Sequence, residues 1–530
     1  MQGRVEVLKG PLHYLRVAGS RSALSLSSKQ AWQGYENERH YEPGEEPLKR
    51  TWHGLSYDFR RWARRFDEAR KDAWQRRHPI AHMKRAVHDH ELLPYRAEIV
   101  VIGGGLTGSS VAYWIKQWFR DEDFKVCVIE NNDKFPQGSS LLSVGGISPQ
   151  HSLAENIEMS LFTSEFLRHA GEHLRILDSE RPDVNFYPCG YLHLACSEED
   201  AETMRNNWKI QTEKGARIAL LTRAQLEERF PAMVFDNVVL GSIALENEGV
   251  FDTWQLLSAL REKNISLGVQ YIKGEVEGFD FAPTHMLPEV HALEEGTAAD
   301  ELAKQTRRIM GLMVRPQMTD ASARPIRCYM MVNCAGPWSG SITKLLGAGD
   351  GPGILSVAYP LEARKRTMFA IHAESAPPDL PMMVLPSGVW MRQDRPGHQF
   401  LVGKHMTAEE DAMLDHSNLE DIDYSLFYDT IWPELVKVVP VLADAKVKSA
   451  WARYESVNTF DGTPIIGEHP QHKNVYTIGG LGHRDAQHAL AVGRAFAERM
   501  FEGAYVNINL RGLDLRRIVK KEPVLENMWP

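Results

Sequence analysis

Short, mostly apolar runs alternate along this chain with longer segments in which apolar residues recur every three or four positions. The runs predict strands buried on both faces of a parallel sheet. They are Ile99–Ile102, Val126–Ile129, Val269–Ile272, Tyr329–Asn333 and Val475–Ile478. The segments with helical spacing are Ser109–Gln117, Thr163–Leu177, Leu256–Leu267 and Gln487–Phe501. The alternation of the two patterns predicts an α/β fold.

Two further stretches predict a second part that is rich in antiparallel β-structure. Phe186–Ala195 is patterned as strand, turn and strand, and residues 381–403 alternate and turn like an antiparallel sheet. Because the buried-strand pattern returns late in the chain, we expect a discontinuous Rossmann-type nucleotide-binding domain, with an α+β substrate-type domain inserted. The expected pieces are 95–185, 245–350 and 445–505 for the first domain and 186–244 and 355–444 for the second. Residues 281–310 are polar and predict a surface insertion.

The first predicted strand is followed at once by a glycine turn and a predicted helix. Gly103, Gly105 and Gly108 give the spacing G-x-G-x-x-G. The first glycine permits a tight turn, the second lets a pyrophosphate approach the backbone, and the third lets the helix pack close to the strand. The free N–H groups of Leu106 and Thr107 at the helix start, together with the helix dipole, favour phosphate binding.

An acidic residue stands where such a site needs one. The second predicted strand ends at Glu130, about 20 residues beyond the last glycine, and a carboxylate at that place accepts a hydrogen bond from a ribose hydroxyl. Asn131 follows it. The carboxylate would repel a 2′-phosphate, which argues against NADP. The alternative, a glycine turn in an ordinary α/β protein, is disfavoured because strand, turn, helix, strand and acid follow in order.

Composition narrows the classes of function. The formal net charge of −9 argues against a nucleic-acid partner, because it offers no broadly basic surface. No run reaches the roughly 18 consecutive apolar residues of a membrane-spanning helix. The five cysteines form no C-x-x-C pair and no metal-binding spacing. We therefore expect neither a metal site nor a secreted fold held by disulfides.

The two ends of the chain differ in composition from the predicted domains. Residues 1–30 are basic, rich in serine and poor in acids, which is typical of a mitochondrial transit peptide, a disordered tail being the alternative. Residues 31–94 predict a charged, partly helical extension. Its arginine-rich part, Tyr57–Arg77, is most simply a solvated helical face, the alternative being a docking surface for a membrane or an acidic partner. Residues 506–530 form a C-terminal tail.

Two segments favour FAD over NAD because they offer small residues along which an extended cofactor can lie. The loop Asp133–Gln150 follows Glu130, and its candidate contacts are Ser139, Ser140, Gly145, Gly146 and Ile147. The strand end VNCAGPWS provides Ala335 and Gly336, where tiny side chains leave room for a cofactor. Taken singly, each segment is also explained as an ordinary loop or strand end.

Two more segments point to the same cofactor. A strand in KGEVEGF would place the backbone of Val276 near the adenine, although an ordinary hairpin explains it equally well. NVYTIGGLG brings Gly480 and Gly482 to the start of a long helix, whose dipole would stabilise negative charge on a reduced flavin. The alternative is a βα unit that only packs.

From about residue 96 to 505, the order of these segments resembles the D-amino-acid oxidase and sarcosine oxidase superfamily of FAD enzymes. Within it, the chain looks most similar to a mitochondrial branch of FAD-dependent oxidoreductase-domain proteins that take part in assembling respiratory complex I. The segments that carry this are SVGGI (143–147), EARKR (362–366), YESVNTFDGTPIIGEHP (454–470) and NLRGLDLRRI (509–518). The resemblance implies a matrix flavoprotein whose partners are complex I subunits or assembly intermediates, with peripheral contact to the inner membrane.

The resemblance is weakest at the flavin-facing turn. Close relatives usually show G-F-S-G-H-G-x-Q there, whereas this chain has GLGHRDAQ from Gly480 to Gln487. In an alignment on Gln487, Arg484 and Asp485 replace the histidine and the second glycine of that pattern. Either this charged pair disturbs the flavin contact, or Arg484 supplies a cation near the reduced ring, and the sequence leaves both open.

Candidate substrate residues follow from the same resemblance. Arg392 in WMRQD matches the position that binds a substrate carboxylate, a task suited to a bidentate guanidinium. The simpler interpretation is a surface arginine on an edge strand. We expect Arg364–Arg366 to form a solvated face, the alternative being that an arginine beside the strand faces the substrate. Tyr454 and His483 are candidate polar groups of an active site, but we expect both to be structural.

Two functions therefore remain open. The resemblance favours an FAD-binding assembly factor for complex I with little or no turnover. The alternative is an active FAD-dependent oxidase or dehydrogenase of a secondary amine or an N-methyl amino acid, in which the cofactor carries the chemistry and the protein orients a small substrate.

Overall fold

The computed structural model describes residues 93–527, except 121–122, 284–305, 318–321, 352, 378–379 and 395–396, together with the single positions 48, 66 and 70. The expected transit peptide and nearly all of the N-terminal extension therefore lie outside the described residues. Contacts divide the chain into two units. Both large sheets belong to the unit that comprises Leu93–Trp114 and Lys125–Pro530.

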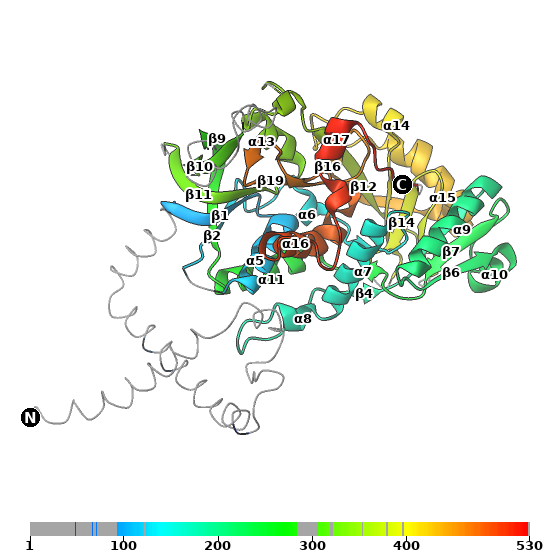
Figure 1. Ribbon diagram of the computed structural model, residues 1–530. Helices are drawn as coiled ribbons and strands as arrows, with labels where there is room; N and C mark the ends of the chain where they lie inside the picture. Colours follow the sequence, from blue (N-terminus) through cyan, green and yellow to red (C-terminus); the bar gives the residue numbers. More distant parts are fainter. Residues whose placement is uncertain are drawn as a thin grey trace, which may run out of the picture. The chain divides into compact units, whose positions relative to one another are not determined.

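The first sheet contains the predicted buried strands at its centre (Figure 1). Among the described residues its order is β17-β19-β11-β1-β2-β9-β10-β18. The strands are β1 Arg96–Ile102, β2 Val126–Glu130, β9 Gln270–Pro283, β10 Arg307–Pro316, β11 Arg324–Asn333, β17 Ile465–Glu468, β18 His472–Lys473 and β19 Val475–Gly479. Strands β19, β11, β1, β2 and β9 pair in parallel, which confirms the prediction of a Rossmann-type sheet.

The predicted insertion at residues 281–310 is partly wrong. Strand β9 continues to Pro283 and β10 begins at Arg307, and the two strands pair antiparallel along most of their length. Ile309, Leu312 and Val314 are buried, whereas Arg307, Met310 and Arg315 are exposed. Residues 284–305 lie outside the described part of the chain.

The second sheet is largely antiparallel, as the alternation of residues 381–403 predicts. In the described part of the chain its order is β16-β12-β15-β14-β13-β5-β7-β6. The strands are β5 Tyr191–Ala195, β6 Ile218–Thr222, β7 Leu240–Ala244, β12 Leu361–His372, β13 Met382–Val384, β14 Val389–Gln393, β15 Gln399–Lys404 and β16 Lys446–Asn458. Strand β16 pairs with β12 along its whole length, so these residues of the expected piece 445–505 belong to the second sheet. The domain boundaries themselves stay predictions.

Helices cover both sheets. The longer ones are α5 Leu106–Trp118, α7 Ala154–Arg168, α9 Glu198–Glu213, α11 Thr253–Ser266 and α16 Asp485–Phe501. Shorter ones are α6 Ser139–Leu142, α8 Ala170–His173, α10 Arg223–Arg229, α13 Ser339–Leu345, α14 Ala408–Met413, α15 Trp432–Val438 and α17 Arg516–Lys520. A Cβ at Gly493 of α16 would overlap Ser110 of α5, so glycine allows these two helices to cross closely. None of the described helices combines the length and apolar content that crossing a bilayer requires.

Helix α7 begins earlier and ends earlier than the predicted helix Thr163–Leu177. Its first turns bury polar side chains, Asn156 and Ser160, beside the apolar Ile157. A face of this kind lacks the apolar period on which the prediction depends. The chain then forms the short α8 and ends its helical course at His173.

Candidate functional site

The glycine turn between β1 and α5 has the geometry that the G-x-G-x-x-G spacing predicts. Gly103 has φ +101°, a conformation that favours glycine, and its N–H donates to the carbonyl oxygen of Ile129 at 2.8 Å. A Cβ at Gly103 would overlap the carbonyl oxygen of Cys334, and a Cβ at Gly108 would overlap the carbonyl oxygen of Gly103. Helix α5 therefore packs on β1 at a distance that only glycine permits.

The start of α5 faces the loop that follows β2. The N–H of Leu106 donates to Oγ of Ser140 at 3.0 Å, and a Cβ at Gly105 would lie 2.9 Å from the same oxygen. Thr107 is half-buried in the same turn. Ser139 begins α6 and is buried. The sequence places these residues in one site, and the structure brings them together at a helix N-terminus, where anions are favoured. The expectation that the N–H of Leu106 is free is wrong, because Ser140 accepts from it.

Glu130 closes the other side of the turn. Its carboxylate accepts from the backbone N–H of Gly104 at 2.7 Å and from that of Asn132 at 2.9 Å. Burial raises the pKa of Glu130, against the lowering effect of these hydrogen bonds. Asn131 accepts from Nε2 of Gln317 at 2.7 Å, so this side chain is held by the first sheet.

Three more predicted contacts lie at the same edge of the sheet. The Cα of Ala335 lies 2.9 Å from the place that a Cβ at Gly103 would take, so the segment that follows β11 lines the glycine turn. Gly336 beside it has φ +54° and open space around it. Val276 lies three residues beyond Lys273, which pairs with Glu130 at the end of β2. The structure thus gathers these positions at the carboxyl ends of the parallel strands, where ligands bind in such folds.

The loop after α6 crosses from the first sheet towards the second. Gly145 has φ +69°, and its carbonyl oxygen accepts from the N–H of Phe251 at 2.8 Å. A Cβ at Gly146 would overlap the hydroxyl of Tyr191. Ile147 is fully buried in β3 (Gly146–Ile147), which pairs with β8 (Gly249–Val250). Glycine is therefore needed here for close packing of the loop against the second sheet.

A cavity of about 150 Å³ lies where this loop and the start of α16 meet strands of the second sheet. That is space for a small organic molecule. Strands β5 and β12–β16 supply most of its wall, the segment 143–151 and the turn before α16 supply the rest, and Glu526 of the C-terminal tail completes it. The apolar part of the wall consists of Val144, Met368, Met382, Met383, Val384, Trp390 and Met391.

Arg392 lines this cavity from β14, which lies inside the second sheet between β13 and β15. The interpretation as a surface arginine on an edge strand is therefore wrong. Its side chain is 12% exposed, its nearest acid is Asp394 at 3.9 Å, and its Nε has no hydrogen-bond partner among the described residues. Burial lowers the pKa of Arg392, although the guanidinium stays charged at neutral pH.

Three other cations of the cavity wall are firmly paired. Arg366 contacts Asp411 and Glu455, Arg453 contacts Glu455, and Lys404 contacts Glu410. The expectation that residues 364–366 form a solvated face is thus wrong for Arg366, which is 13% exposed and lines the cavity. Tyr454, by contrast, is directed away from the cavity and donates to the carbonyl oxygen of Ser417.

Four histidines line the cavity, and all are uncharged at neutral pH. Burial lowers the pKa of His151 to about 4 and that of His193 and of His405 to about 3. The pKa of His483 lies well below its usual value, because it is buried and its ring centroid lies 4.4 Å from that of His405. His483, which we expect from the sequence to be structural, lies in the cavity wall.

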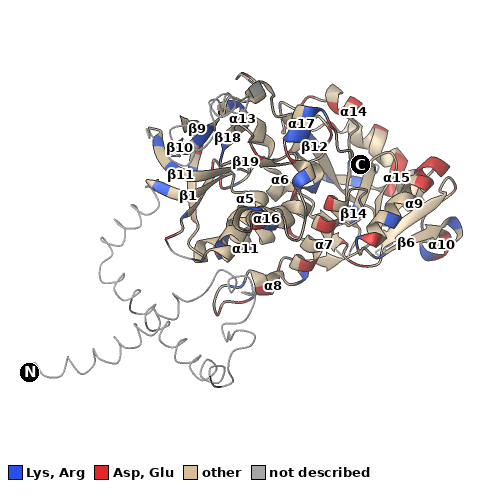
Figure 2. Cartoon of the chain, viewed as in Figure 1, with Lys and Arg blue, Asp and Glu red and all other residues tan. Residues whose placement is uncertain are grey.

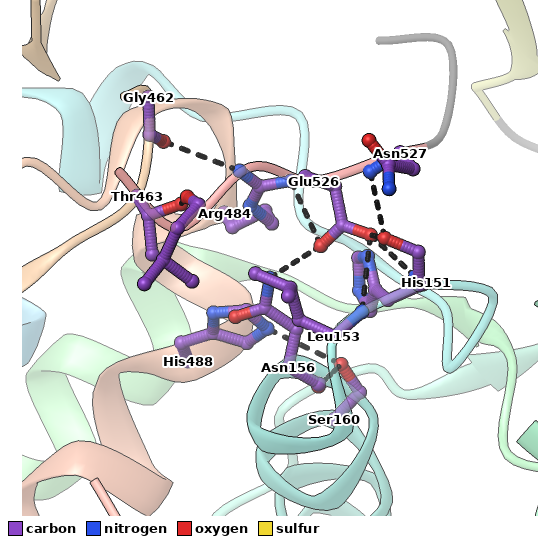
Figure 3. A network of polar contacts seen from close by, with 12 residues as sticks. His151, Leu153, Asn156, Ser160, Gly462, Thr463, Arg484, His488, Glu526 and Asn527 are labelled. Atoms are coloured by element: carbon purple, nitrogen blue, oxygen red, sulfur yellow. Dashed lines mark hydrogen bonds and ion pairs between the residues drawn. The ribbon is translucent and has the colours of Figure 1, made fainter. Parts of the chain in front are cut away.

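Arg484, in the turn before α16, contacts the C-terminal tail (Figure 3). Arg484 is 9% exposed, and its Nη1 lies 3.9 Å from Oε2 of Glu526. The Glu526 carboxylate also accepts from the N–H groups of Ser152 and Leu153 and, at 2.6 Å, from Nδ2 of Asn156. Glu526 thus caps the start of α7 and faces Arg484 at the same time.

The remaining predicted residues hold the turn together. Gly480 has φ +75° and donates to Oγ of Ser456 at 2.9 Å, and Gly482 has φ +60° with open space beside it. Gln487 accepts from the N–H of Ser148 at 3.2 Å and donates to its carbonyl oxygen at 3.0 Å. The amide of Gln487 therefore fixes the loop 145–151 against α16. Asp485 is buried beside Arg453 at 3.8 Å, and burial raises its pKa.

Sequence reasoning missed Glu248, which organises the floor of the site. Its carboxylate is buried and accepts from Oγ of Ser148, from Nε2 of Gln150 at 2.8 Å and from the N–H of Tyr191 at 2.7 Å. Burial raises its pKa from 4.5 to about 7, although these donors favour the charged form. In the sequence ENEGV it is indistinguishable from a loop acid at the surface.

We predict that Glu248 makes the stability of the fold depend on pH. Because its pKa is higher in the folded than in the unfolded chain, its contribution is full below about pH 4.5 and is lost as the pH rises to about 7. The loss amounts to about 3 kcal/mol. Chemical denaturation at several pH values should show that Glu248→Gln removes this slope. The difference between the two proteins isolates Glu248 from the buried histidines, whose contribution has the opposite sign, and equal slopes would contradict the prediction.

A comparison with known protein families shows which family the chain matches. Residues 98–499 match the DAO family, whose description is FAD dependent oxidoreductase. The chain belongs to the DAO family. Proteins called FAD-dependent oxidoreductase domain-containing protein 1 are similar to it: that of Xenopus laevis is 37% identical over 82% of this chain and 85% of its own length. That of Bos taurus is 39% identical over 79% of this chain and 84% of its own length.

Solved structures share the fold of this DAO-family chain. L-proline dehydrogenase from P. horikoshii has a TM-score of 0.65 at 21% identity and covers 82% of this chain and 100% of its own. Glycine oxidase from Bacillus cereus has a TM-score of 0.56 at 18% identity and covers 77% and 95% of the two chains. These likenesses confirm the predicted fold class.

The described residues fit FAD, the cofactor of the DAO family, and the cofactor prediction is confirmed. The glycine turn of Gly103–Gly108 leaves no room for side chains and presents the start of α5, as a pyrophosphate site requires. Glu130 lies at the end of β2, where a ribose hydroxyl would meet it. Ala335 lines the glycine turn, and the loop 139–147 extends from this end of the site to the cavity.

Proposed function

We propose that this chain is an FAD-dependent oxidoreductase that holds a small, carboxylate-bearing amine in the cavity, and that it serves the assembly of respiratory complex I in the mitochondrial matrix. The first part rests on one observation, the buried guanidinium of Arg392 in the wall of the cavity, whose Nε has no hydrogen-bond partner among the described residues. The second part rests on the likeness of the chain to its relatives and on the composition of residues 1–30.

The residues of the cavity suit the binding of such a substrate. Arg392 would take the carboxylate in a bidentate contact, and its position fixes which end of the substrate faces the site. Met383, Met391 and Trp390 exclude water around the rest of the molecule. A neutral imidazole, such as that of His405, has an unprotonated ring nitrogen that can accept a hydrogen bond from the substrate nitrogen. FAD, when bound, accepts the hydride.

A change at Arg392 tests this part of the proposal. We predict that Arg392→Gln weakens binding of a carboxylate-bearing amine about tenfold to a hundredfold, because it removes hydrogen bonds to a charged group. The measurement is anaerobic bleaching of the bound flavin at increasing concentrations of sarcosine, dimethylglycine or related amines. Arg364→Gln is the matched control, since Arg364 lies on β12 but does not line the cavity. Absence of bleaching with all of a broad amine panel would refute substrate oxidation.

The role in complex I assembly needs a different test. In cells that lack this protein, we expect the amount of assembled complex I to fall, and to recover with the full chain. A chain without residues 1–30 should fail to restore it if these residues direct import. Normal complex I in the deletion cells would contradict the proposal. The outcome with Arg392→Gln shows whether assembly depends on the cavity.

One surface of the described residues offers contact to an acidic partner or to the inner membrane. Lys and Arg gather on β10 and β11, whereas Asp and Glu gather on α9 and α14 (Figure 2). The exposed arginines of β10 and β11 are Arg307, Arg315, Arg324 and Arg327. We propose this face as the contact surface, and co-purification of complex I intermediates with a variant that carries Gln at these four positions would test it.

A further inference from the structure

Two cations in the cavity wall lack a close carboxylate. The nearest acidic oxygen to Arg392 belongs to Asp394 at 3.9 Å, and that to Arg484 belongs to Glu526 at 3.9 Å. Each guanidinium keeps a buried Nε without a hydrogen-bond partner among the described residues. Because a buried donor costs free energy unless an acceptor meets it, both positions fit the acidic group of a ligand.

The two guanidinium groups are separate anchor points. Arg392 projects from β14 of the second sheet. Tyr191 lies close enough to act on the pKa of this guanidinium, which burial lowers. Arg484 belongs to the turn before α16, where its Nη2 donates to the carbonyl oxygen of Gly462 at 3.4 Å. The contacts of Arg392 and those of Arg484 involve different residues, and both side chains line the same cavity.

Glu526 lies near Arg484 but forms no close ion pair with it. Both carboxylate oxygens of Glu526 already accept from donors at the start of α7, namely Ser152, Leu153 and Asn156. The carboxylate therefore cannot turn to form a bidentate contact, and one Nη of Arg484 is all that it approaches. Figure 3 shows this arrangement, in which Glu526 lies between Arg484 and the helix start.

We propose that the cavity binds a small amine with two acidic groups, one on Arg392 and the other on Arg484. The inference deepens the proposed function and rests on it, since it assigns the first carboxylate to Arg392. It explains why a buried arginine stands in this turn and why the C-terminal tail supplies a residue to hold it. The competing explanation is that Arg484 faces only the flavin, where it would stabilise the reduced ring.

Two unreactive acids of equal size distinguish these explanations. Succinate has two carboxylates, and succinamate has one carboxylate and one carboxamide. We would titrate each into the FAD-loaded protein and follow the change in the flavin absorption spectrum. The proposal predicts that succinate binds at least tenfold more tightly than succinamate, that Arg484→Gln abolishes this ratio, and that Arg484→Lys retains part of it. Arg392→Gln should weaken both acids.

The outcomes separate the two proposals. If succinate and succinamate bind alike, or if Arg484→Gln leaves their ratio unchanged, the second anchor is refuted while the carboxylate site at Arg392 stands. A change in flavin reduction potential in Arg484→Gln, with an unchanged ratio, would assign this arginine to the flavin. If neither acid binds, the carboxylate site at Arg392 is refuted and the inference with it. FAD content and thermal unfolding of each variant identify any that fails to fold.

Discussion

Replacing Arg517 by alanine is expected to destabilise the protein by about 3–5 kcal/mol, because it leaves a buried carboxylate without its cation. Nε and Nη2 of Arg517 donate to the two oxygens of Asp461 at 2.8 and 3.1 Å, and both side chains are almost fully buried. Nη2 also donates to the carbonyl oxygens of Thr463 and Pro464. Thermal or chemical unfolding measures the loss.

The same substitution should loosen the tail that brings Glu526 to the cavity. The Asp461 carboxylate, which Arg517 holds in place, accepts from the N–H of Val524 at 3.1 Å, and the backbone carbonyl oxygen of Arg517 accepts from the N–H of Glu522 at 2.8 Å. Faster hydrogen exchange in residues 522–527 is therefore expected before global unfolding. Arg516→Ala is the control, since Arg516 is 72% exposed and should change stability by less than about 0.5 kcal/mol. Equal effects of the two variants would contradict this account.

Replacing Gly108 by alanine is expected to abolish stable FAD binding. The new Cβ would overlap the carbonyl oxygen of Gly103 and lie 3.2 Å from Cγ1 of Val101, so α5 must move away from β1. That movement displaces the N–H groups at the start of the helix, which would hold the pyrophosphate. We expect the affinity for FAD to fall at least tenfold, measured by the ratio of flavin to protein absorption after gel filtration.

Gly278→Ala is the matched control for Gly108→Ala. Gly278 lies in β9 of the same sheet, and a Cβ there would meet no atom within 4 Å. This variant should keep its FAD, so that loss of the cofactor in Gly108→Ala follows from the overlap and not from losing any glycine. FAD retention by Gly108→Ala equal to that of the control would refute the assignment of the turn.

The first sheet and the nucleotide-binding end of the site could be predicted from the sequence, because the patterns that indicate them lie within short segments of the chain. Short, mostly apolar runs give β2 and β19 to within one residue of their observed bounds, whereas β1 begins three residues earlier than predicted, at Arg96. The glycine spacing and Glu130 follow within one βαβ unit, and close packing explains each glycine. Helix α7 was misplaced because its buried face includes Asn156 and Ser160, which remove the apolar period.

The cavity could be predicted only in part, because residues far apart in sequence form it. Arg392 and Arg484 were singled out, yet nothing in their neighbourhoods shows that both face one cavity. Glu526 lies in a tail without a periodic pattern, and its role depends on the anchoring of that tail by Asp461. Glu248 and the neutral histidines owe their properties to burial, which composition does not report.

The amount of FAD in the purified protein tests the central claim most directly. A visible spectrum, compared with the protein concentration, gives the FAD content, and acid precipitation shows whether the flavin is covalently held. The account predicts an oxidised flavin spectrum with about one FAD per chain, since one glycine turn, one acidic strand end and one cavity form a single site. A protein that is folded, carries no flavin and takes up none when FAD is added would contradict it.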